Sequence, residues 1–293
     1  MTTALDLSAA TRKVADRLAA ATVSIGREAR GSGMVVGTGR VLTNAHLLRD
    51  TTTSVGFADG RTAQGSVVGI DPDGDLAVLE VETSGAPTAE LATDAPAPGD
   101  LVFGVGRGGG TFRVTFGVVS AAGAAFRGPR GRRIAGAVEH TAPLARGSSG
   151  GPLADAEGRV VGVNTHRGAP GFYLARPTDE SVRARIAQLV AGETIGRRSL
   201  GLALAPSHVA RRLRQAVGLP DRAGLLVRGV DVDGPAARAG VREGDLLVRA
   251  GGRDVADVDE LHAVLDAVGA ADSLAIVIVR GVDELELVVE PLA

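Results

Sequence analysis

The sequence predicts a mainly β chain with two domains, and three observations support this prediction. The chain has 293 residues, which exceeds the usual size of one domain. From Val23 to about Ile134, short runs rich in Val, Ile, Leu and Thr alternate with Gly, Asp and Pro, which is typical of an antiparallel sandwich or barrel. Near residue 196 the pattern changes to strand-like runs around two helical stretches, so we expect domains at 1–196 and 197–293.

Two segments of the first domain show the apolar spacing of helices. Residues 8 to 20 place Val14 and Leu18 on one face, with Ser8 as the expected cap. A second helix is expected to begin at Thr178 and to close the domain. Its apolar face consists of Val182, Ile186, Leu189 and Val190.

The composition excludes several classes of protein. Hydrophobic residues make up 44 % and charged residues 23 % of the chain, which is typical of a globular protein. No apolar run reaches the roughly 18 residues of a membrane helix, so we expect no transmembrane segment. The aromatic share of 2 % and the formal net charge of -2 argue against a base-stacking surface and a basic footprint, so nucleic acid is not an expected partner.

The sequence says little about the cellular compartment. The chain has no cysteine, which excludes disulfides, thiolate metal sites and cysteine nucleophiles. The first residues show neither a basic start before an apolar core nor a cleavage-like site. A cytoplasmic location is therefore the default expectation, and a periplasmic or extracellular one applies if a leader precedes the given sequence.

The stretch RGSSGGPL, residues 146 to 153, has the composition of a catalytic serine loop. A serine hydroxyl is a weak nucleophile, so it needs a base, a group that orients the base, and donors for the oxyanion. Gly147 allows a positive φ, and the amides of Gly147 and Ser149, with Ser148 between them, are the expected oxyanion hole. Alone, such a run is more often a simple turn.

The partners of Ser149 are present in a suitable order. His46 lies at the end of the predicted strand RVLTNAHLL, and Asp75 precedes the predicted strand LAVLEV. We therefore expect His46 as general base, Asp75 as its orienting group and Ser149 as nucleophile. Together these three residues favour an active site, whereas the serine loop alone does not.

No metal, nucleotide or other cofactor is expected. The other histidines, His140, His166, His208 and His262, lack metal-ligand spacing and are interpreted as surface or structural residues. The acids of DPDGDLAVLEVE resemble a calcium loop, but Leu76 stands where such a loop needs glycine. FGVGRGGG lacks the Lys-Ser/Thr of a phosphate loop and is interpreted as a hairpin connection.

Four blocks of the sequence resemble the HtrA (DegP-like) serine proteases: GSGMVVGTGRVLTNAHLL, DPDGDLAVLEV, VFGVGRGGGTFRVTFGVVSA and RGSSGGPL. The resemblance extends from about residue 14 to the C-terminus. It implies a chymotrypsin-like double antiparallel β-barrel followed by an α+β PDZ domain. It also implies an acyl-enzyme mechanism without metal or cofactor, and a role in protein quality control.

The second domain resembles a PDZ domain through LVRGVDVDGPAARAGVREGDLLVRAGGRDV. Such domains add a peptide to a sheet edge and hold its carboxylate with backbone amides of a loop. By position that loop is Ser199 to Leu202, which includes Leu200 and Gly201, and the facing helix contributes Leu261 and Leu265. Hydrophobic peptide C-termini are the expected ligands.

The chain departs from the family pattern in several places. Ala145 and Arg146 replace the usual Asn-Pro before the oxyanion loop, and Thr141 replaces an aspartate upstream of it. The loop FRGPRGRR, residues 126 to 133, is rich in arginine where the family has a regulatory loop. It is interpreted as a solvated connection, with docking of an acidic effector as the alternative. No aromatic residue precedes Phe57, which argues against the trimer that the family builds on N-terminal aromatics.

The predicted function is a serine endopeptidase that cleaves unfolded or misfolded proteins. By position, Leu144 and the strand residues Asn164, Thr165 and His166 border the primary specificity pocket, where no acid is evident. We therefore expect a preference for small or medium aliphatic residues before the cleaved bond. Two alternatives stay open: a non-proteolytic peptide-binding chaperone or scaffold on a protease fold, and a purely structural adaptor.

Overall fold

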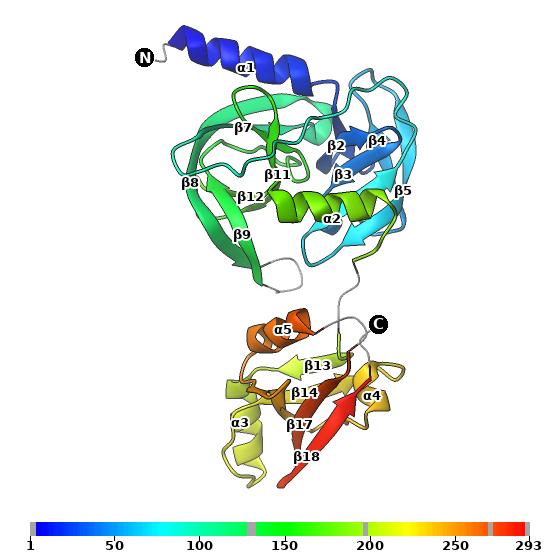
Figure 1. Cartoon of the computed structure of the whole chain (residues 1–293), viewed down its shortest axis with the longest axis vertical. Coiled ribbons are helices and arrows are strands. Elements are labelled where there is room, and N and C mark those ends of the chain that lie inside the picture. Colours follow the sequence, from blue (N-terminus) through cyan, green and yellow to red (C-terminus); the bar gives the residue numbers. More distant parts are fainter. Residues whose placement is uncertain (1–3, 128–132, 196–198, 269–271, 291–293) are drawn as a thin grey trace. The chain divides into compact units, whose positions relative to one another are not determined.

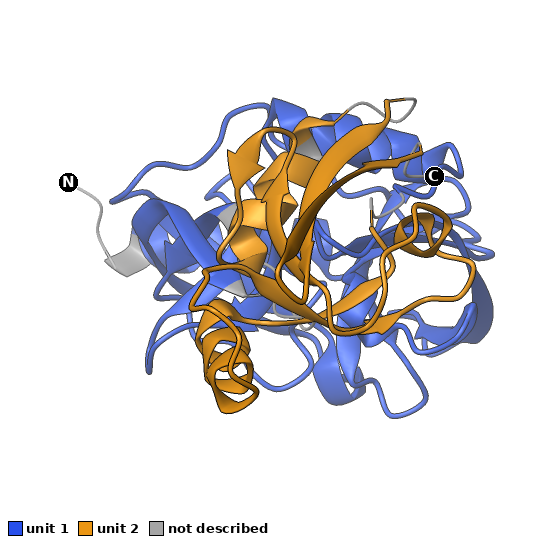
Figure 2. Ribbon diagram, turned by 90° about the horizontal axis from the view of Figure 1, so that it is seen from below, with its two compact units in different colours: residues 1–196 blue, residues 197–293 orange. Residues whose placement is uncertain are grey.

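The structure is a computed structural model that describes residues 4–127, 133–195, 199–268 and 272–290. The chain divides into two compact units, residues 1–196 and 197–293 (Figure 2). Each unit has hydrophobic clusters of its own, built mainly from Val, Leu, Ile and Ala. The prediction of a mainly β chain that begins with antiparallel barrels is confirmed.

The first barrel closes in the strand order β1-β2-β3-β6-β5-β4, and every pairing in it is antiparallel (Figure 1). Its strands are β1 (Thr22–Ile25), β2 (Gly31–Gly37), β3 (Arg40–Thr43), β4 (Thr52–Gly56), β5 (Thr62–Asp71) and β6 (Leu76–Glu80). The four residues of β1 are all buried, which explains its short unbroken run of β-formers.

The second barrel closes in the order β10-β11-β12-β9-β8-β7. Its strands are β7 (Leu101–Gly106), β8 (Arg113–Arg127), β9 (Arg133–His140), β10 (Pro152–Ala154), β11 (Val160–Arg167) and β12 (Tyr173–Pro177). The 3-10 turn η2 (Gly108–Gly110) joins β7 to β8, so the interpretation of FGVGRGGG as a hairpin connection is confirmed. Most of the arginine-rich loop, residues 128–132, lies outside the described residues.

Both helices of the first unit begin at a different residue from the one predicted. The helix α1 (Ala4–Leu18) starts before Ser8, so Ser8 is inside the helix and does not cap it. The helix α2 (Glu180–Val190) is capped by Asp179, which accepts a hydrogen bond from the Val182 amide at 2.9 Å. The Thr178 hydroxyl donates instead to the Val160 carbonyl at 2.8 Å, so it is not available as a cap.

A buried arginine fastens the end of β7 to the first barrel. Arg107 is 8 % exposed, and its guanidinium donates to the carbonyl of Thr22 at 2.7 Å and to that of Ala19 at 2.5 Å. Burial lowers the pKa of Arg107, which nevertheless remains charged at neutral pH. The cleft between the barrels therefore depends on contacts from a strand of one barrel to backbone of the other.

The second unit is a sheet in the order β13-β14-β15-β17-β18, with β16 paired to β15. Its strands are β13 (Leu202–Ala205), β14 (Leu225–Val230), β15 (Leu246–Ala250), β16 (Arg253–Asp254), β17 (Leu274–Arg280) and β18 (Asp283–Val289). Its helices are α3 (Ser207–Ala216), α4 (Pro235–Arg238) and α5 (Val258–Ala267). The sequence predicted only α4 and α5 and missed α3, which is rich in arginine and buries only Ala210 and Arg214.

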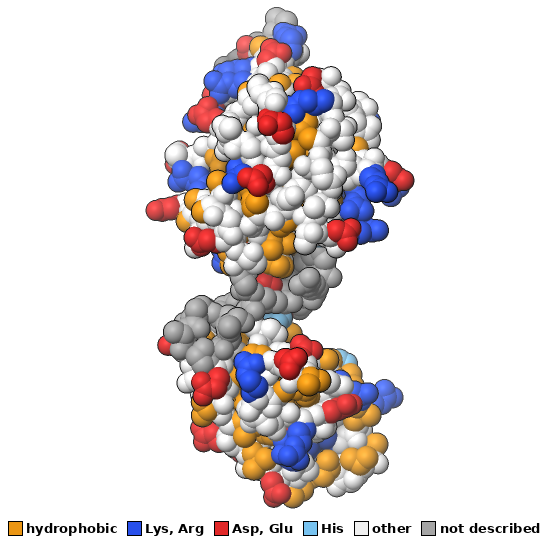
Figure 3. Space-filling model, turned by 90° about the vertical axis from the view of Figure 1, so that its right-hand side faces the viewer, with side chains coloured by type: hydrophobic (Ala, Val, Ile, Leu, Met, Phe, Trp, Pro, Cys, Tyr) orange, Lys and Arg blue, Asp and Glu red, His pale blue; other side chains and the backbone are white. Residues whose placement is uncertain are grey.

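The surface shows charges of both signs. On the face in Figure 3, Lys and Arg side chains alternate with Asp and Glu, without an extended area of one sign. Within the described residues, no helix is long and apolar enough to cross a membrane.

The buried His140 makes the stability of the first unit dependent on pH. Its ring is fully buried on β9 and stacks on Tyr173 at a centroid distance of 5.8 Å. Burial lowers the pKa of His140 to about 4. Because the unfolded chain takes up this proton near pH 6.5 and the folded chain does not, stability is lost as the pH falls from about 6.5 to about 4.

We expect this residue to destabilise the first unit by about 2 kcal/mol between pH 7.5 and pH 5.0. Urea unfolding followed by the fluorescence of Tyr173, the only tyrosine, measures it. His140→Gln should remove this part of the pH dependence, whereas His208→Gln, at an exposed site, should retain it. An identical pH dependence in His140→Gln would contradict the assignment.

Candidate active site

His46 lies on a short turn that leaves the first barrel. The strand β3 ends at Thr43 and is followed by the 3-10 turn η1 (Ala45–Leu47), so the prediction of His46 at the end of a strand was wrong by one turn. The buried Asn44 holds this turn, because its side-chain amide donates to the Asp75 carbonyl at 2.9 Å. Asn44, two residues before His46, thus connects the turn that carries the histidine to the backbone of Asp75.

The Asp75 carboxylate binds both the imidazole ring and the backbone amide of His46. The imidazole Nδ1 lies 2.8 Å from Oδ2 and 2.9 Å from Oδ1, and the backbone amide of His46 donates to Oδ1 at 3.0 Å. Asp75 is 1 % exposed, so this carboxylate depends on protein donors in place of water. The contact fixes the proton of His46 on Nδ1 and leaves Nε2 as an acceptor.

The turn before Asp75 is locked to α2. The buried Asp71 accepts hydrogen bonds from the amides of Asp73 at 3.2 Å and Gly74 at 2.8 Å. Arg185 of α2 donates to the same carboxylate at 2.6 Å. Asp75 itself has a φ of 56°, a left-handed conformation that aspartate tolerates better than most residues. The acids that resemble a calcium loop therefore form a turn that orients Asp75.

Thr165 supplies a further donor to Asp75. Its hydroxyl lies 2.5 Å from Oδ2, and His166 Nδ1 lies 2.8 Å from the same hydroxyl oxygen. Since the hydroxyl donates to the carboxylate, it accepts from His166. The sequence assigned Thr165 to the substrate pocket and missed this role. A threonine on a strand carries no local signal that shows which distant residue its hydroxyl binds.

Ser149 lies beside this network. Its hydroxyl donates to the Thr165 carbonyl at 2.8 Å, and its own carbonyl accepts from the Ser32 amide at 2.8 Å. Gly150 has a φ of +83°, and a Cβ there would lie 2.1 Å from the Ser32 carbonyl. Only glycine therefore fits behind the serine. The structure joins His46 to Asp75 and joins the Ser149 hydroxyl to Thr165, whose own hydroxyl also binds Asp75.

The oxyanion loop is held by a serine of the first barrel. Ser32 donates from its hydroxyl to the Gly147 carbonyl at 2.6 Å and accepts from the Arg107 amide at 2.8 Å. The Ser148 amide donates to the Ala145 carbonyl at 3.2 Å, so it is engaged in the loop itself. Within the described part of the chain, no acceptor is found for the amides of Gly147 and Ser149. These two are the donors that remain for an oxyanion.

The preceding peptide of this loop packs on Gly108. A Cβ at position 108 would lie 2.3 Å from the Arg146 carbonyl and 2.8 Å from the Gly147 Cα. Because Gly108 has no side chain, the Arg146 carbonyl can lie close to η2. Gly108 positions the loop at the place where the chain lacks the expected Asn-Pro.

His166 lies next to the catalytic candidates. Its ring centroid is 5.2 Å from that of His46 and 5.0 Å from that of Phe126. The sequence grouped it with the scattered histidines and also assigned it to the border of the specificity pocket; the structure places its ring next to that of His46. Burial lowers its pKa, so at neutral pH it adds no charge beside His46. The ligand atoms of His46, Asp75 and His166 lie within 4.8 Å of one another, but His46 and Thr165 already occupy the Asp75 oxygens.

The other predicted pocket residues differ in exposure. Leu144 is half-buried and lies against Gly104 of β7. Asn164 is fully buried, and its side-chain amide donates to the Pro152 carbonyl at 2.7 Å, so it supports the wall from inside the barrel.

The second unit contains an apolar groove between β13 and α5. A cavity of about 180 Å³ is lined by the predicted Leu200, Leu202, Leu261 and Leu265. Leu204, on the strand 202–205 that the sequence assigned to the groove, also lines it, as do Val258 and His262, which the sequence missed. The predicted Gly201 is not among the lining residues; its φ is +70° and its amide donates to the Ser199 hydroxyl at 3.0 Å.

The fold and the His46–Asp75 contact indicate the class of the protein. Two closed antiparallel barrels that carry a histidine bound to a buried aspartate are typical of chymotrypsin-like serine peptidases. Trypsin-like peptidase domains as a family match residues 31–163, and PDZ domains match residues 226–280.

Individual relatives agree with this class. The putative serine protease HhoA of Synechocystis is 33 % identical over 89 % of this chain and 70 % of its own length. A probable periplasmic serine endoprotease of DegP type from Brucella suis is 30 % identical over 86 % of this chain, which spans only 50 % of that protein. Among solved structures, the HtrA-type protease AlgW with a decapeptide is 25 % identical, with a TM-score of 0.69 over 96 % of this chain and 97 % of that one.

The chain belongs to the HtrA family of serine proteases and is, by class, a serine endopeptidase that carries a PDZ domain. The expected family and fold class are therefore confirmed. The DegP-like relatives are named periplasmic, so the default expectation of a cytoplasmic location gains no support.

The Ser32 hydroxyl offers a test of how the oxyanion loop is held. Ser32→Ala removes the donor to Gly147 and leaves the Arg107 amide without its acceptor. We expect kcat for a peptide substrate to fall about tenfold with little change in KM, because a positioning bond of about 1.4 kcal/mol is lost.

The matched control is Ser24→Ala, which removes a longer bond of 3.4 Å to the Gly56 carbonyl on the neighbouring strand. It should leave kcat within about twofold of the unaltered protein. Equal losses in both variants would mean that Ser32 contributes only to stability.

Proposed function

We propose that the chain hydrolyses peptide bonds within unfolded proteins through His46, Asp75 and Ser149. The observation that carries this proposal is the buried contact of 2.8 Å between His46 Nδ1 and Asp75 Oδ2, beside the serine loop. A buried carboxylate fixed in this way selects the imidazole tautomer that can accept a proton on Nε2.

Catalysis begins with a rotation of the Ser149 hydroxyl. At rest it donates to the Thr165 carbonyl, so it must turn toward His46 Nε2 before it attacks. His46 then takes the hydroxyl proton as the oxygen bonds to the substrate carbonyl carbon. The Asp75 carboxylate stabilises the imidazolium that forms, and Thr165 keeps this carboxylate oriented.

The tetrahedral oxyanion is bound by the amides of Gly147 and Ser149. Each such donor is worth about 3 to 4 kcal/mol in the transition state. When the intermediate collapses, His46 gives its proton to the leaving amine, and the acyl group stays on Ser149. Water, deprotonated by His46, then releases the acyl group and restores the enzyme.

Substrate choice before the cleaved bond is proposed to follow the walls formed by Leu144 and β11. Asn164 and Thr165 carry no charge, and the Asn164 amide is bound to Pro152 and the Thr165 hydroxyl to Asp75. A small or medium aliphatic residue suits this surface, as the family resemblance implies.

The PDZ domain is proposed to bind hydrophobic peptide C-termini in the groove between β13 and α5. Its apolar lining suits the last side chain of a peptide, and β13 lies at the edge of its sheet, where a peptide strand can add. Exposed hydrophobic C-termini are a feature of damaged proteins, which supports a role in protein quality control.

Ser149→Ala tests the catalytic assignment. The unaltered protein should degrade unfolded casein, and the variant should lose at least about a thousandfold in rate because it lacks the nucleophile. Far-UV circular dichroism should show equal folding of the two proteins. Comparable cleavage by both would contradict the assignment, and no cleavage by either, with retained peptide binding, would favour a non-proteolytic scaffold.

The PDZ groove is tested by the binding of a peptide that ends in a hydrophobic residue. Leu202→Glu places a charge in the groove and should weaken binding of this peptide at least about tenfold, measured by fluorescence anisotropy. Val282→Glu is the control, since Val282 is 68 % exposed and outside the groove. Equal binding by the two variants would place the peptide elsewhere.

A further inference from the structure

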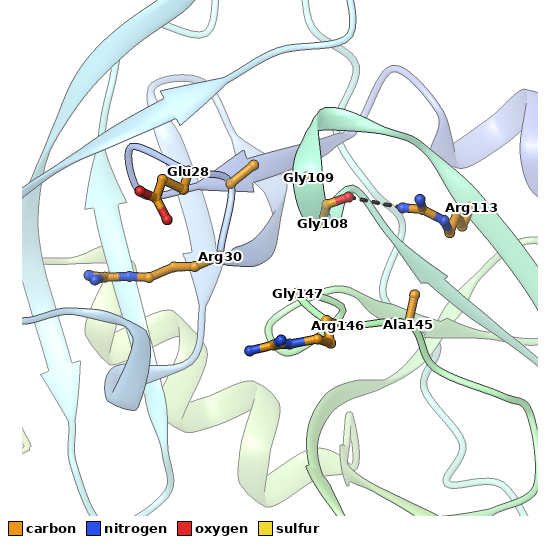
Figure 4. A pocket seen from close by; sticks show the side chains of 9 residues that line it. Glu28, Arg30, Gly108, Gly109, Arg113, Ala145, Arg146 and Gly147 are labelled. Atoms are coloured by element: carbon orange, nitrogen blue, oxygen red, sulfur yellow. Dashed lines mark hydrogen bonds between the residues drawn. The ribbon is translucent and has the colours of Figure 1, made fainter.

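A charged cavity lies directly beside the oxyanion loop. It has a volume of about 500 Å³ and is bordered by Arg146 and Gly147 of that loop, by Gly108 of η2, and by the segment before β2 that contains Glu28 and Arg30. Figure 4 shows Arg30 and Arg146 extending toward the same side of this cavity, and Arg113 on its opposite wall. The catalytic roles assigned above use none of these arginine side chains.

The cavity has an excess of positive charge. Its lining contains three arginines and a single carboxylate, that of Glu28. Arg113 donates to the Gly108 carbonyl at 2.9 Å, and Arg30 donates to the Leu47 carbonyl at 2.9 Å. These acceptors are neutral and fix the guanidinium groups without cancelling their charge. Among the described residues, neither Arg146 nor Glu28 takes part in an ion pair.

One wall of the cavity adjoins the turn that carries His46. Arg30 donates to the carbonyl of Leu47, the residue directly after His46, so this wall adjoins the turn that carries the general acid. His46 must protonate the leaving amine, which therefore departs on this side. The residues assigned to the acyl side, Leu144 and the strand β11, do not line the cavity.

We propose that this cavity binds an acidic side chain from the first or second residue after the cleaved bond. Arginine forms paired hydrogen bonds with a carboxylate, and an aspartate or glutamate would balance the excess charge around Gly147. The inference rests on the proposed function and adds a substrate class to it. Arg146, which replaces the proline usual in the family, acquires a role in specificity.

The test uses two peptides that differ only in Asp against Asn at the first two positions after the cleaved bond. Both end in a carboxamide, so that the PDZ domain cannot hold a terminal carboxylate. Their dissociation constants are measured by fluorescence anisotropy on the full chain carrying Ser149→Ala, which separates binding from cleavage. We expect the Asp peptide to bind about fivefold more tightly, and the ratio to shrink in 0.5 M salt.

Three variants in the same background assign the preference to this cavity. Arg146→Gln should lower the ratio and Glu28→Gln should raise it, because the two variants change the charge of the lining in opposite directions. Arg27→Gln removes an exposed arginine of the same loop that does not line the cavity, and it should leave the ratio unchanged.

Equal binding of the two peptides, or a ratio that survives Arg146→Gln, would overturn the inference. Cleavage of the same peptides by the chain with Ser149 intact provides the separate test of the proposed function. A binding preference without cleavage would support the cavity and contradict the protease mechanism, whereas cleavage of both peptides with equal binding would do the reverse.

Discussion

The buried Asp75 carboxylate is the constraint on which the rest of the site depends. A carboxylate removed from water is stable as an anion only if donors replace its hydration, and here the donors come from His46 and Thr165. His46 belongs to the first barrel and Thr165 to the second. The Asp75 carboxylate therefore needs both barrels in their correct positions. The hydrogen bond that it accepts from His46 also fixes the imidazole proposed as general base.

The oxyanion loop shows the same dependence on both barrels. Ser32, on a strand of the first barrel, binds the Gly147 carbonyl and the Arg107 amide of the second. Arg107 in turn reaches back to the carbonyls of Ala19 and Thr22. The loop that lacks the family's stiff Asn-Pro approach is thus held by tertiary contacts, so a disturbance of the interface between the barrels is expected to reach the site.

Strand spacing predicted an antiparallel sandwich or barrel and a second unit, and the family resemblance of short local motifs predicted the double barrel that the structure shows. The same motifs predicted His46, Asp75 and Ser149 as site residues. The sequence did not reveal the roles of Ser32, Gly108 and Thr165, since each acts on a residue distant in the chain. The starts of the helices also differ from the prediction. Thr178 has the sequence features of a cap, but its hydroxyl donates to a carbonyl of β11. The cavity was missed for the same reason, as its arginines come from three separate segments.

The most direct test of the account is labelling of the serine pair with diisopropyl fluorophosphate, followed by mass spectrometry of the digested protein. The account predicts one adduct, on Ser149, because only that hydroxyl is served by His46, while Ser148 is buried and held in the loop. It also predicts that His46→Ala abolishes the adduct without unfolding the chain. An adduct on Ser148, or equal labelling of Ser149 without His46, would contradict the proposed mechanism.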